Sequence, residues 1–252
     1  MNTEKDFEKL MPKRIEFEIT HLCNKMCDNC SHRIKNSSFK YTTLFDLDKI
    51  ISCLNPKEFN SVLITGGEPL CHPFFEQFMK KIKEKFPHLS KQAIIIQTNG
   101  TLLEKVPKQV FEQFSWWISE YPGWNDKIIK KYCNNENVSI HPWNSWWPLK
   151  DPNLNEIDAK IISEKCPYHQ IRIIGTKLYR CCHSEGIERN FSIEKVHSDI
   201  SKNWKFDWIN LPVWKACQHC HQAFLIQGKW KSNKEFRNIS HKHKLNLFNL
   251  FR

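Results

Sequence analysis

The sequence predicts an α/β fold, a parallel sheet or barrel that carries a small C-terminal module. Two observations predict it. Short apolar segments alternate with helical patterns up to about residue 165, and beyond Cys166 the pattern changes to a hairpin followed by cysteine-bearing chain. Repeated alternation of strand and helix is typical of parallel sheets and barrels, whose functional residues gather at the carboxyl ends of the strands.

The first predicted strand covers residues 14–20, where Ile15, Phe17 and Ile19 alternate with polar residues. Four later segments are short and bounded by turn residues, and most of them are continuously apolar, as buried parallel strands are. These segments cover residues 62–65, 93–98, 115–119 and 138–141.

Helical patterns fill the intervals between these strands. Thr43 is suited to cap a helix over residues 44–54, and Asn155 to cap one that ends near residue 165. Pro73 suits the first turn of a further helix that has one apolar face. That face consists of Phe74, Phe75, Phe78, Ile82 and Phe86. Weaker helical patterns cover residues 103–114 and 125–133.

Three parts are expected along the chain. Residues 12–165 form the α/β part, residues 166–228 the small module and residues 229–252 a basic tail. The module opens with a hairpin over residues 170–181 that turns near Gly175, and it continues as irregular chain. We expect the amphipathic end of the tail to pack onto the body as a helix.

Composition narrows the class of protein. An apolar content of 40% over 252 residues is enough for a packed core and excludes a wholly disordered chain. The charged N-terminal segment lacks a signal-peptide pattern, and no run approaches ~18 apolar residues, so we expect a cytoplasmic protein without a membrane span. In the cytoplasm, the eleven cysteines indicate metal sites or catalysts before disulfides.

The net charge of +11 favours polyanionic partners such as nucleic acid, a nucleotide substrate or an anionic membrane surface. A solvated, lysine-rich surface accounts for the same charge equally well. Charge therefore does not name the substrate, and it leaves nucleic acid open as a partner.

Cys23, Cys27 and Cys30 place three thiols directly after the first predicted strand. Three thiolates cannot supply the four ligands of an ordinary iron–sulfur cubane, so one iron would stay open to another ligand. A zinc site is the alternative, because His21 or His32 can supply the fourth ligand.

Two of the seven glycines, Gly66 and Gly67, stand side by side at the end of the second predicted strand, followed by Glu68 and Pro69. Glycines there let the backbone turn sharply and approach a ligand closely. Together with the spacing of the three cysteines, this strand end resembles the radical S-adenosylmethionine (SAM) superfamily.

The resemblance implies a partial (β/α) TIM-like barrel of five or six parallel strands with a small β-hairpin iron–sulfur module. It also implies a [4Fe–4S] cluster on Cys23, Cys27 and Cys30, whose open iron is chelated by SAM. Reductive cleavage of SAM would release a 5′-deoxyadenosyl radical that abstracts hydrogen from a substrate. The residues that the resemblance assigns to SAM are Gly66, Gly67, Glu68 and Pro69 for the amino group, Thr98 and Asn99 near the site, and Ser119 for the carboxylate or ribose.

A second cysteine set lies in the module. Cys217 and Cys220 have the spacing of a metal knuckle, and Cys166 with Cys181 or Cys182 flanks the predicted hairpin. The arrangement resembles the Twitch-type extension, a shortened SPASM domain, which holds an auxiliary [4Fe–4S] cluster. We favour Cys181 over Cys182 because Lys177-Leu-Tyr-Arg-Cys181 resembles the strand that leads to this ligand in relatives. A zinc ribbon is the alternative.

More narrowly, the chain resembles radical SAM proteins often found with polysaccharide and glycosyltransferase genes, through segments such as His21-Leu-Cys-Asn and Ile118-Ser-Glu-Tyr-Pro122. We expect dehydrogenation or epimerisation of a carbohydrate-like metabolite, and an anionic one such as a sugar nucleotide or phosphate fits the net charge. The auxiliary cluster would accept an electron, and a flavodoxin- or ferredoxin-type protein would donate one. The alternatives are a peptide- or nucleotide-modifying radical SAM enzyme and a zinc-stabilised nucleic-acid-binding protein.

The remaining cysteines and several tryptophans have less specific interpretations. Cys53, Cys71 and Cys133 fit no cluster spacing and are expected to be buried, inert thiols. Trp116 and Trp117 either pack in the core or wall a substrate cavity. For the loop tryptophans we favour the cavity, and these are Trp143, Trp146 and Trp147.

Overall fold

The computed structural model describes residues 11–223, apart from residues 26, 28, 29, 122, 142–150, 168, 221 and 222. The predicted tail at 229–252 and the tryptophans Trp143, Trp146 and Trp147 lie outside the described residues. Among the helices of the described part, none is long and apolar enough to cross a membrane.

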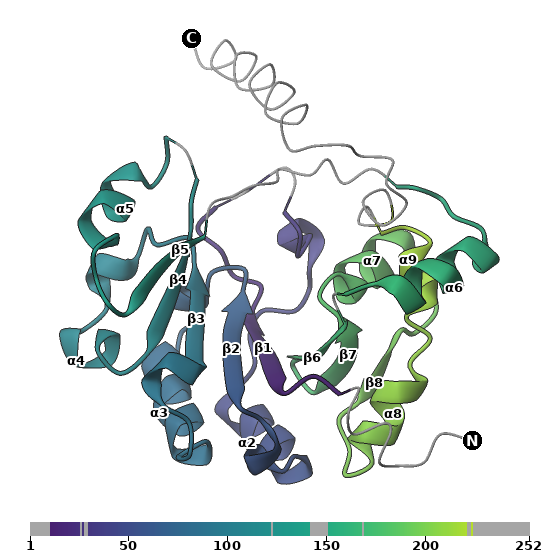
Figure 1. Cartoon of the computed structure of the whole chain (residues 1–252), viewed down its shortest axis with the longest axis horizontal. Coiled ribbons are helices and arrows are strands. Elements are labelled where there is room, and N and C mark those ends of the chain that lie inside the picture. The colour runs from purple at the N-terminus through teal and green to yellow at the C-terminus, as the bar shows by residue number, and fades with distance from the viewer. Residues whose placement is uncertain are drawn as a thin grey trace.

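The described chain forms an eight-stranded sheet with the order β5-β4-β3-β2-β1-β6-β7-β8 (Figure 1). The strands from β5 to β6 run parallel, whereas β7 and β8 join antiparallel. The predicted α/β class with a partial barrel of parallel strands is therefore confirmed. The strands are β1 (Arg14–Thr20), β2 (Ser61–Gly66), β3 (Ile94–Thr98), β4 (Ser115–Ser119), β5 (Val138–His141), β6 (His169–Ile174), β7 (Lys177–Cys181) and β8 (His197–Asp199).

Helices connect these strands and carry the predicted caps. Thr43 accepts a hydrogen bond from the amide of Asp46, whose carboxylate accepts one from Thr43 in return, and Asn155 accepts from the amide of Asp158. The helices are α2 (Leu44–Cys53), α3 (Phe75–Lys85), α4 (Lys108–Phe111), α5 (Asp126–Tyr132), α6 (Glu156–Lys165), α7 (Ser184–Phe191), α8 (Trp204–Asn210) and α9 (Trp214–Cys217).

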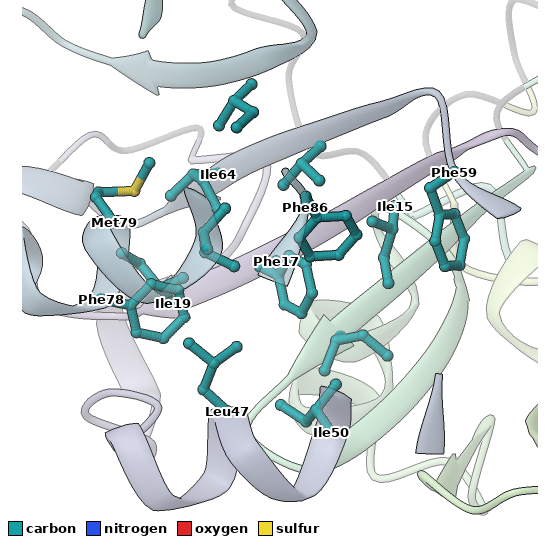
Figure 2. Close-up of a cluster of buried hydrophobic side chains, with 14 of the residues drawn as sticks. Ile15, Phe17, Ile19, Leu47, Ile50, Phe59, Ile64, Phe78, Met79 and Phe86 are labelled. Carbon is teal, nitrogen blue, oxygen red and sulfur yellow. The ribbon is translucent and has the colours of Figure 1, made fainter. Parts of the chain in front are cut away.

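The core lies between the parallel strands and the helices α2 and α3 (Figure 2). Ile15, Phe17 and Ile19 of β1 point to this side and are at most 2% exposed. They meet Leu47 of α2, and Phe86 at the end of α3 packs edge-on against Phe17 at 6.4 Å between ring centroids. The predicted alternation along β1 therefore separates a helix-facing side from an opposite side, which we call the inner face.

Two local predictions were wrong at the start of α3. The helix begins at Phe75, two residues after Pro73, because Pro73 lies in a turn closed by the bond from the Phe75 amide to the His72 carbonyl. Phe74 has a non-helical backbone at the cap position, so its ring leaves the apolar face and is 44% exposed.

A third prediction failed after the hairpin. The hairpin itself is confirmed as β6 and β7, with its turn at Gly175, whose φ of 57° lies in the left-handed region. The chain beyond it is ordered into α7, β8, α8 and α9 rather than irregular. Apolar residues of these elements pack inward, as the buried Ile187, Trp204 and Trp208 show.

Strand β4 separates the two adjacent tryptophans. Trp116 is fully buried in the core and stacks on Phe111. Trp117 lies on the inner face, with its ring 4.4 Å from that of His141 and the Arg14 guanidinium 5.2 Å above it. Core packing thus explains Trp116 alone.

The inner face where β1 meets β6 carries buried charge. Glu16 and Glu18 of β1 are 5% and 2% exposed, and Arg172 of β6 is 1% exposed. The Arg172 Nε donates to Glu18 Oε2 at 2.9 Å, and its Nη2 lies 3.1 Å from Glu16 Oε1. Burial raises the pKa of the Glu18 carboxyl, but Arg172 and His32 outweigh it and hold the pKa well below its usual range. The ion pair therefore joins β6 to β1.

Arg172→Met should lower the free energy of unfolding by about 3–5 kcal/mol, because it leaves two buried carboxylates without their cation. The pKa of Glu18 is lower in the folded protein than its unfolded value of 4.5, so the wild-type contribution is full above about pH 4.5 and is lost as the pH falls further. Chemical denaturation at pH 7 measures the difference. Lys81→Met, which breaks a half-exposed pair with Asp48, is the control and should cost at most ~1 kcal/mol. An equally small loss for Arg172→Met would contradict the account.

Candidate functional site

The first cysteine set lies on the loop that follows β1, at the carboxyl end of the sheet. The Cys30 amide donates to the Cys27 carbonyl at 3.3 Å, and the Lys25 amide donates to Cys23 Sγ at 3.4 Å. Burial raises the pKa of the Cys23 thiol to about 12, and the neighbouring Cys27 thiol and Glu68 carboxyl add to the rise. Cys23 is thus a protonated thiol next to Cys27, so binding iron there would displace its proton.

The glycine-rich end of β2 packs directly on this cysteine loop. The Gly67 amide donates to the Thr20 carbonyl at 2.6 Å, and the Glu68 amide to the Leu22 carbonyl at 2.9 Å. A Cβ on Gly67 would lie 2.5 Å from the Leu22 carbonyl oxygen and 3.0 Å from Cys23 Cβ, and one on Gly66 would lie 2.3 Å from the Thr20 carbonyl oxygen. Sequence reasoning assigned these glycines to a sharp turn and to a ligand, whereas the structure shows that the cysteine loop also requires them.

Glu68 joins the ends of β2 and β3. Its fully buried carboxylate accepts hydrogen bonds from the Thr98 hydroxyl at 2.7 Å, the Asn99 amide at 2.7 Å and the Leu70 amide at 3.2 Å. Burial raises the pKa of Glu68 to about 7 despite these donors. The predicted site residues Glu68, Thr98 and Asn99 are therefore brought together, and Pro69 follows them, buried at the start of a 3₁₀ turn.

Two asparagines that the sequence analysis did not assign to the site, Asn24 and Asn125, extend this network. Asn99 Nδ2 donates to Asn24 Oδ1 at 3.0 Å and thereby fixes the cysteine loop to β3. Asn125 is 2% exposed, and its Nδ2 lies 2.8 Å from the carbonyls of both Asn99 and Ser119. The predicted Ser119 thus lies at the same edge, held through its carbonyl. Asn125 had been treated only as the start of a weak helical pattern.

Two further residues of this edge were missed. Burial raises the pKa of Tyr121, and the thiols of Cys27, Cys30 and Cys23 raise it further, so this ring lies beside the cysteine loop. Cys71 is half-buried and close enough to Cys23 for the two thiols to interact. In the sequence analysis, residues 118–122 were noted only as part of the family resemblance. The spacing of Cys71 gave no indication that it lies near the first cysteine set.

The other two unassigned cysteines lie apart from these contacts. Cys53 is half-buried, and its Sγ lies 4.0 Å from the Ile200 carbonyl. Cys133 is exposed, so the expectation of a buried thiol was wrong there, because the short helix α5 ends at the surface.

Two imidazoles flank the first cysteine set, as the zinc alternative requires. His21 Nδ1 makes a hydrogen bond with Ser37, and its Nε2 lies 3.0 Å from Glu18 Oε1. His32 places Nδ1 2.9 Å from the same carboxylate. Both imidazoles thus lie around Glu18, and the zinc alternative stays open.

The second cysteine set is assembled by α6 and α9. These helices pack through Ala159, Ile162 and Cys217, which brings Cys166 at the end of α6 towards Cys217. Burial raises the pKa of the Cys217 thiol, and the thiols of Cys181 and Cys166 raise it further. Cys220 lies three residues after Cys217 and is 7% exposed.

The choice between Cys181 and Cys182 stays a prediction, and the side chains of the two residues interact with each other. Cys181 ends β7, is 8% exposed and interacts with Cys217. The backbone of Cys182 is engaged elsewhere, because its carbonyl accepts a hydrogen bond from Arg172 Nη1 at 2.6 Å. Cys166, Cys181, Cys217 and Cys220 stay the predicted ligands.

Among the residues that the structure describes, no three potential ligands converge as a metal-binding group. Two features nevertheless fit iron–sulfur clusters. The Cys23 thiol interacts with that of Cys27, and the Cys217 thiol with those of Cys181 and Cys166. Arg33 Nη2, beside Cys220, is a buried donor without an acceptor in the described part of the chain. An anionic cluster would supply that acceptor.

Comparison with known proteins identifies the first half of the chain. Residues 17–115 match the model of the Radical SAM superfamily. The chain is 33% identical over 97 residues to 7-carboxy-7-deazaguanine synthase of Rickettsia prowazekii, covering 35% of this chain and 37% of that protein. It is 34% identical over 115 residues to the protein of the same name from Methanothermobacter thermautotrophicus, covering 45% and 41%. The chain thus spans about two fifths of the length of these relatives.

The fold is similar to the crystal structure of BtrN in complex with AdoMet and 2-DOIA. The TM-score is 0.58 at 17% identity, covering 88% of this chain and 91% of that one. This likeness shows the fold, including the strands that follow the barrel. The matched segment, residues 17–115, holds the three cysteines and the glycine-rich strand end, and it is similar to the radical SAM superfamily.

Proposed function

We propose that the protein is a radical SAM enzyme that abstracts hydrogen from a carbohydrate-like metabolite. The observation that carries this proposal is the contact between the cysteine loop and the glycine-rich end of β2, where Gly67 lies against Cys23 and Leu22. This contact places three thiols beside a strand end rich in backbone polar groups. Together they form one site for a cluster and a ligand.

In this site Cys23, Cys27 and Cys30 would hold a [4Fe–4S] cluster with one open iron. The cluster and SAM, when bound, supply the 5′-deoxyadenosyl radical. Glu68 is suited to bind the amino group of SAM in its charged, ammonium form. Burial raises the pKa of Glu68 to about 7, and a bound cation would offset this effect. The network of Glu68, Thr98 and Asn99 would hold the strand ends in place around the ligand, and Ser119 lies at the same edge.

A carbohydrate-like substrate is supported by the inner face of the sheet. Trp117 and His141 present adjacent rings there, and half-buried Gln97 lies on the same face of neighbouring β3. Aromatic rings pack against the C–H faces of sugars, and a few polar groups fix the orientation of a ligand. BtrN, whose fold is similar to that of this chain, was solved in complex with AdoMet and 2-DOIA.

The second cysteine set is proposed to hold an auxiliary [4Fe–4S] cluster that accepts the electron left on the substrate. Loss of a hydrogen atom from a carbon that bears a hydroxyl gives a ketyl-like radical, and loss of a proton and an electron completes a dehydrogenation. A flavodoxin- or ferredoxin-type protein would donate the electron that cleaves SAM. Anaerobic incubation with SAM, reductant and candidate sugar nucleotides, with detection of 5′-deoxyadenosine and oxidised sugar, tests the proposal.

Replacing Cys23, Cys27 and Cys30 by Ala should remove one cluster and abolish 5′-deoxyadenosine formation, because each thiolate would be the protein ligand of one iron. Iron analysis and chromatography after anaerobic incubation measure both effects. Cys133→Ala, which changes an exposed thiol, is the matched control and should retain both. Continued formation of 5′-deoxyadenosine by the triple variant would rule out the assignment.

Replacing Cys217 and Cys220 by Ala should lower the iron content to about half and stop oxidation of the substrate, because two of the four thiolates of the second set are lost. Some uncoupled cleavage of SAM should remain, since the first set is untouched. Iron analysis and assays of both products test this, with Cys53→Ala as the control. An unchanged iron content would show that no auxiliary cluster is held there.

Gly67→Ala should lower the iron content of the first set and destabilise the fold by about 1–3 kcal/mol, because the new Cβ would force the Leu22 carbonyl and Cys23 apart from β2. Gly123→Ala is the control, since its Cβ would meet nothing within 4 Å and only its φ of 79° is unfavourable. Iron analysis and thermal denaturation compare the two. Full iron content with weakened SAM binding in Gly67→Ala would instead show that this glycine serves the ligand alone.

A further inference from the structure

Three arginines surround the second cysteine set, and the proposed function leaves them unused. They come from three separate parts of the chain: the loop after the first cysteine set, β6 and β7. We call them the arginine collar, and its members are Arg33, Arg172 and Arg180. Each is held by contacts that fix its position relative to a particular cysteine.

Arg172 approaches the end of β7 from the inner face. Its Nη1 donates to the Cys182 carbonyl at 2.6 Å, and Glu16 and Glu18 hold the rest of the guanidinium. Burial lowers the pKa of Arg172, but the two carboxylates outweigh it and raise the pKa above its usual value, with Cys182 and Cys181 adding to the rise. The group is therefore a permanent positive charge beside these thiols.

Arg180 precedes Cys181 in β7 and points to the opposite face, because neighbouring strand residues alternate. Its Nη1 donates to the Ile209 carbonyl at 2.8 Å, and its guanidinium lies 4.8 Å from the Trp208 ring centroid. Burial lowers the pKa of Arg180, and the Cys217 thiol opposes that effect. Arg180 thus brings a positive charge to Cys217.

Arg33 reaches the set from the other cysteine loop. Its backbone has a φ of 50°, in the left-handed region, and its carbonyl accepts a hydrogen bond from Arg189 Nη1 of α7 at 2.8 Å. Its guanidinium lies 5.3 Å from the Phe191 ring centroid, and Cys220 packs against the same helix. Burial lowers the pKa of Arg33, and Cys220 is the group that opposes this effect most. The Arg33 Nη2 atom is the buried donor that has no acceptor among the described residues.

The collar places three guanidinium groups around four thiols, and of these the charge of Arg172 is already balanced by Glu16 and Glu18. Four thiolates give an oxidised [4Fe–4S] cluster a net charge of about −2, and one-electron reduction adds a further negative charge. Nearby positive charge in a partly buried site stabilises the more negative state, because the low dielectric weakens the attraction less than water does. Guanidinium groups serve this purpose well, since they stay charged when buried.

We propose that the arginine collar raises the reduction potential of the auxiliary cluster and so makes it the electron acceptor of the reaction. This rests on the proposed auxiliary cluster on Cys166, Cys181, Cys217 and Cys220. In the step concerned, the substrate radical forms its C=O double bond, releases the hydroxyl proton and gives one electron to the cluster, which passes from the oxidised to the one-electron-reduced state. The collar stabilises the negative charge that this electron adds to the cluster.

The test uses the full chain, reconstituted anaerobically with iron and sulfide, and measures midpoint potentials by redox titration with electron paramagnetic resonance. Arg180→Gln and Arg33→Gln should each shift the auxiliary potential to a lower value, and the double variant should shift it further. Arg180→Lys, which keeps the charge, should shift it less. Lys108→Gln, an 84% exposed lysine on α4, is the matched control and should leave both potentials unchanged.

Arg180→Gln is the most direct variant, because its contacts lie in the module and none involves the first cysteine set. Added SAM should change the spectrum of the first cluster alone and so distinguish the two signals. Unchanged auxiliary potentials in iron-replete Arg180→Gln and Arg33→Gln would overturn the collar proposal and leave the proposed enzyme intact. Wild-type protein that binds iron for only one cluster would overturn the auxiliary cluster itself, and the collar proposal with it.

Discussion

The close approach of two backbone segments at the carboxyl end of the sheet determines the rest of the site. The loop after β1 must carry three cysteines, and it passes so near the end of β2 that Gly66 and Gly67 have no room for a side chain. Amides of Gly67 and Glu68 donate to carbonyls of Thr20 and Leu22, which continues the pairing of β1 and β2 beyond the strands. Glu68 is thereby set between strand ends, where Thr98 and Asn99 satisfy its carboxylate.

Much of this arrangement was predictable from local patterns. The strands appear within about two residues of the apolar segments, because a short buried segment has few other ways to pair its backbone. Thr43 and Asn155 cap their helices as their side chains predict, and the hairpin turns at Gly175. The cysteine and glycine motifs were recognisable because their spacing is local. Their ligand roles stay predictions.

The rest depended on contacts that sequence spacing does not reveal. Arg172 and Glu18 form a buried pair although 154 positions separate them, and neither shows any local pattern of a partner. The three arginines around the second cysteine set come from separate segments for the same reason. Asn125 was missed because a buried asparagine that joins two carbonyls resembles an ordinary turn residue in sequence. Phe74 was misplaced because the helix begins one residue later than its apolar pattern.

The account requires one cluster with an open iron on Cys23, Cys27 and Cys30, next to a ligand site at the end of β2. Mössbauer spectroscopy of protein reconstituted with iron-57, recorded with and without SAM, tests this claim most directly. We expect two [4Fe–4S] clusters per chain, of which one shows a distinct iron whose signal changes when SAM is added. Protein that binds zinc instead, or clusters whose spectrum is unchanged by SAM, would contradict the account.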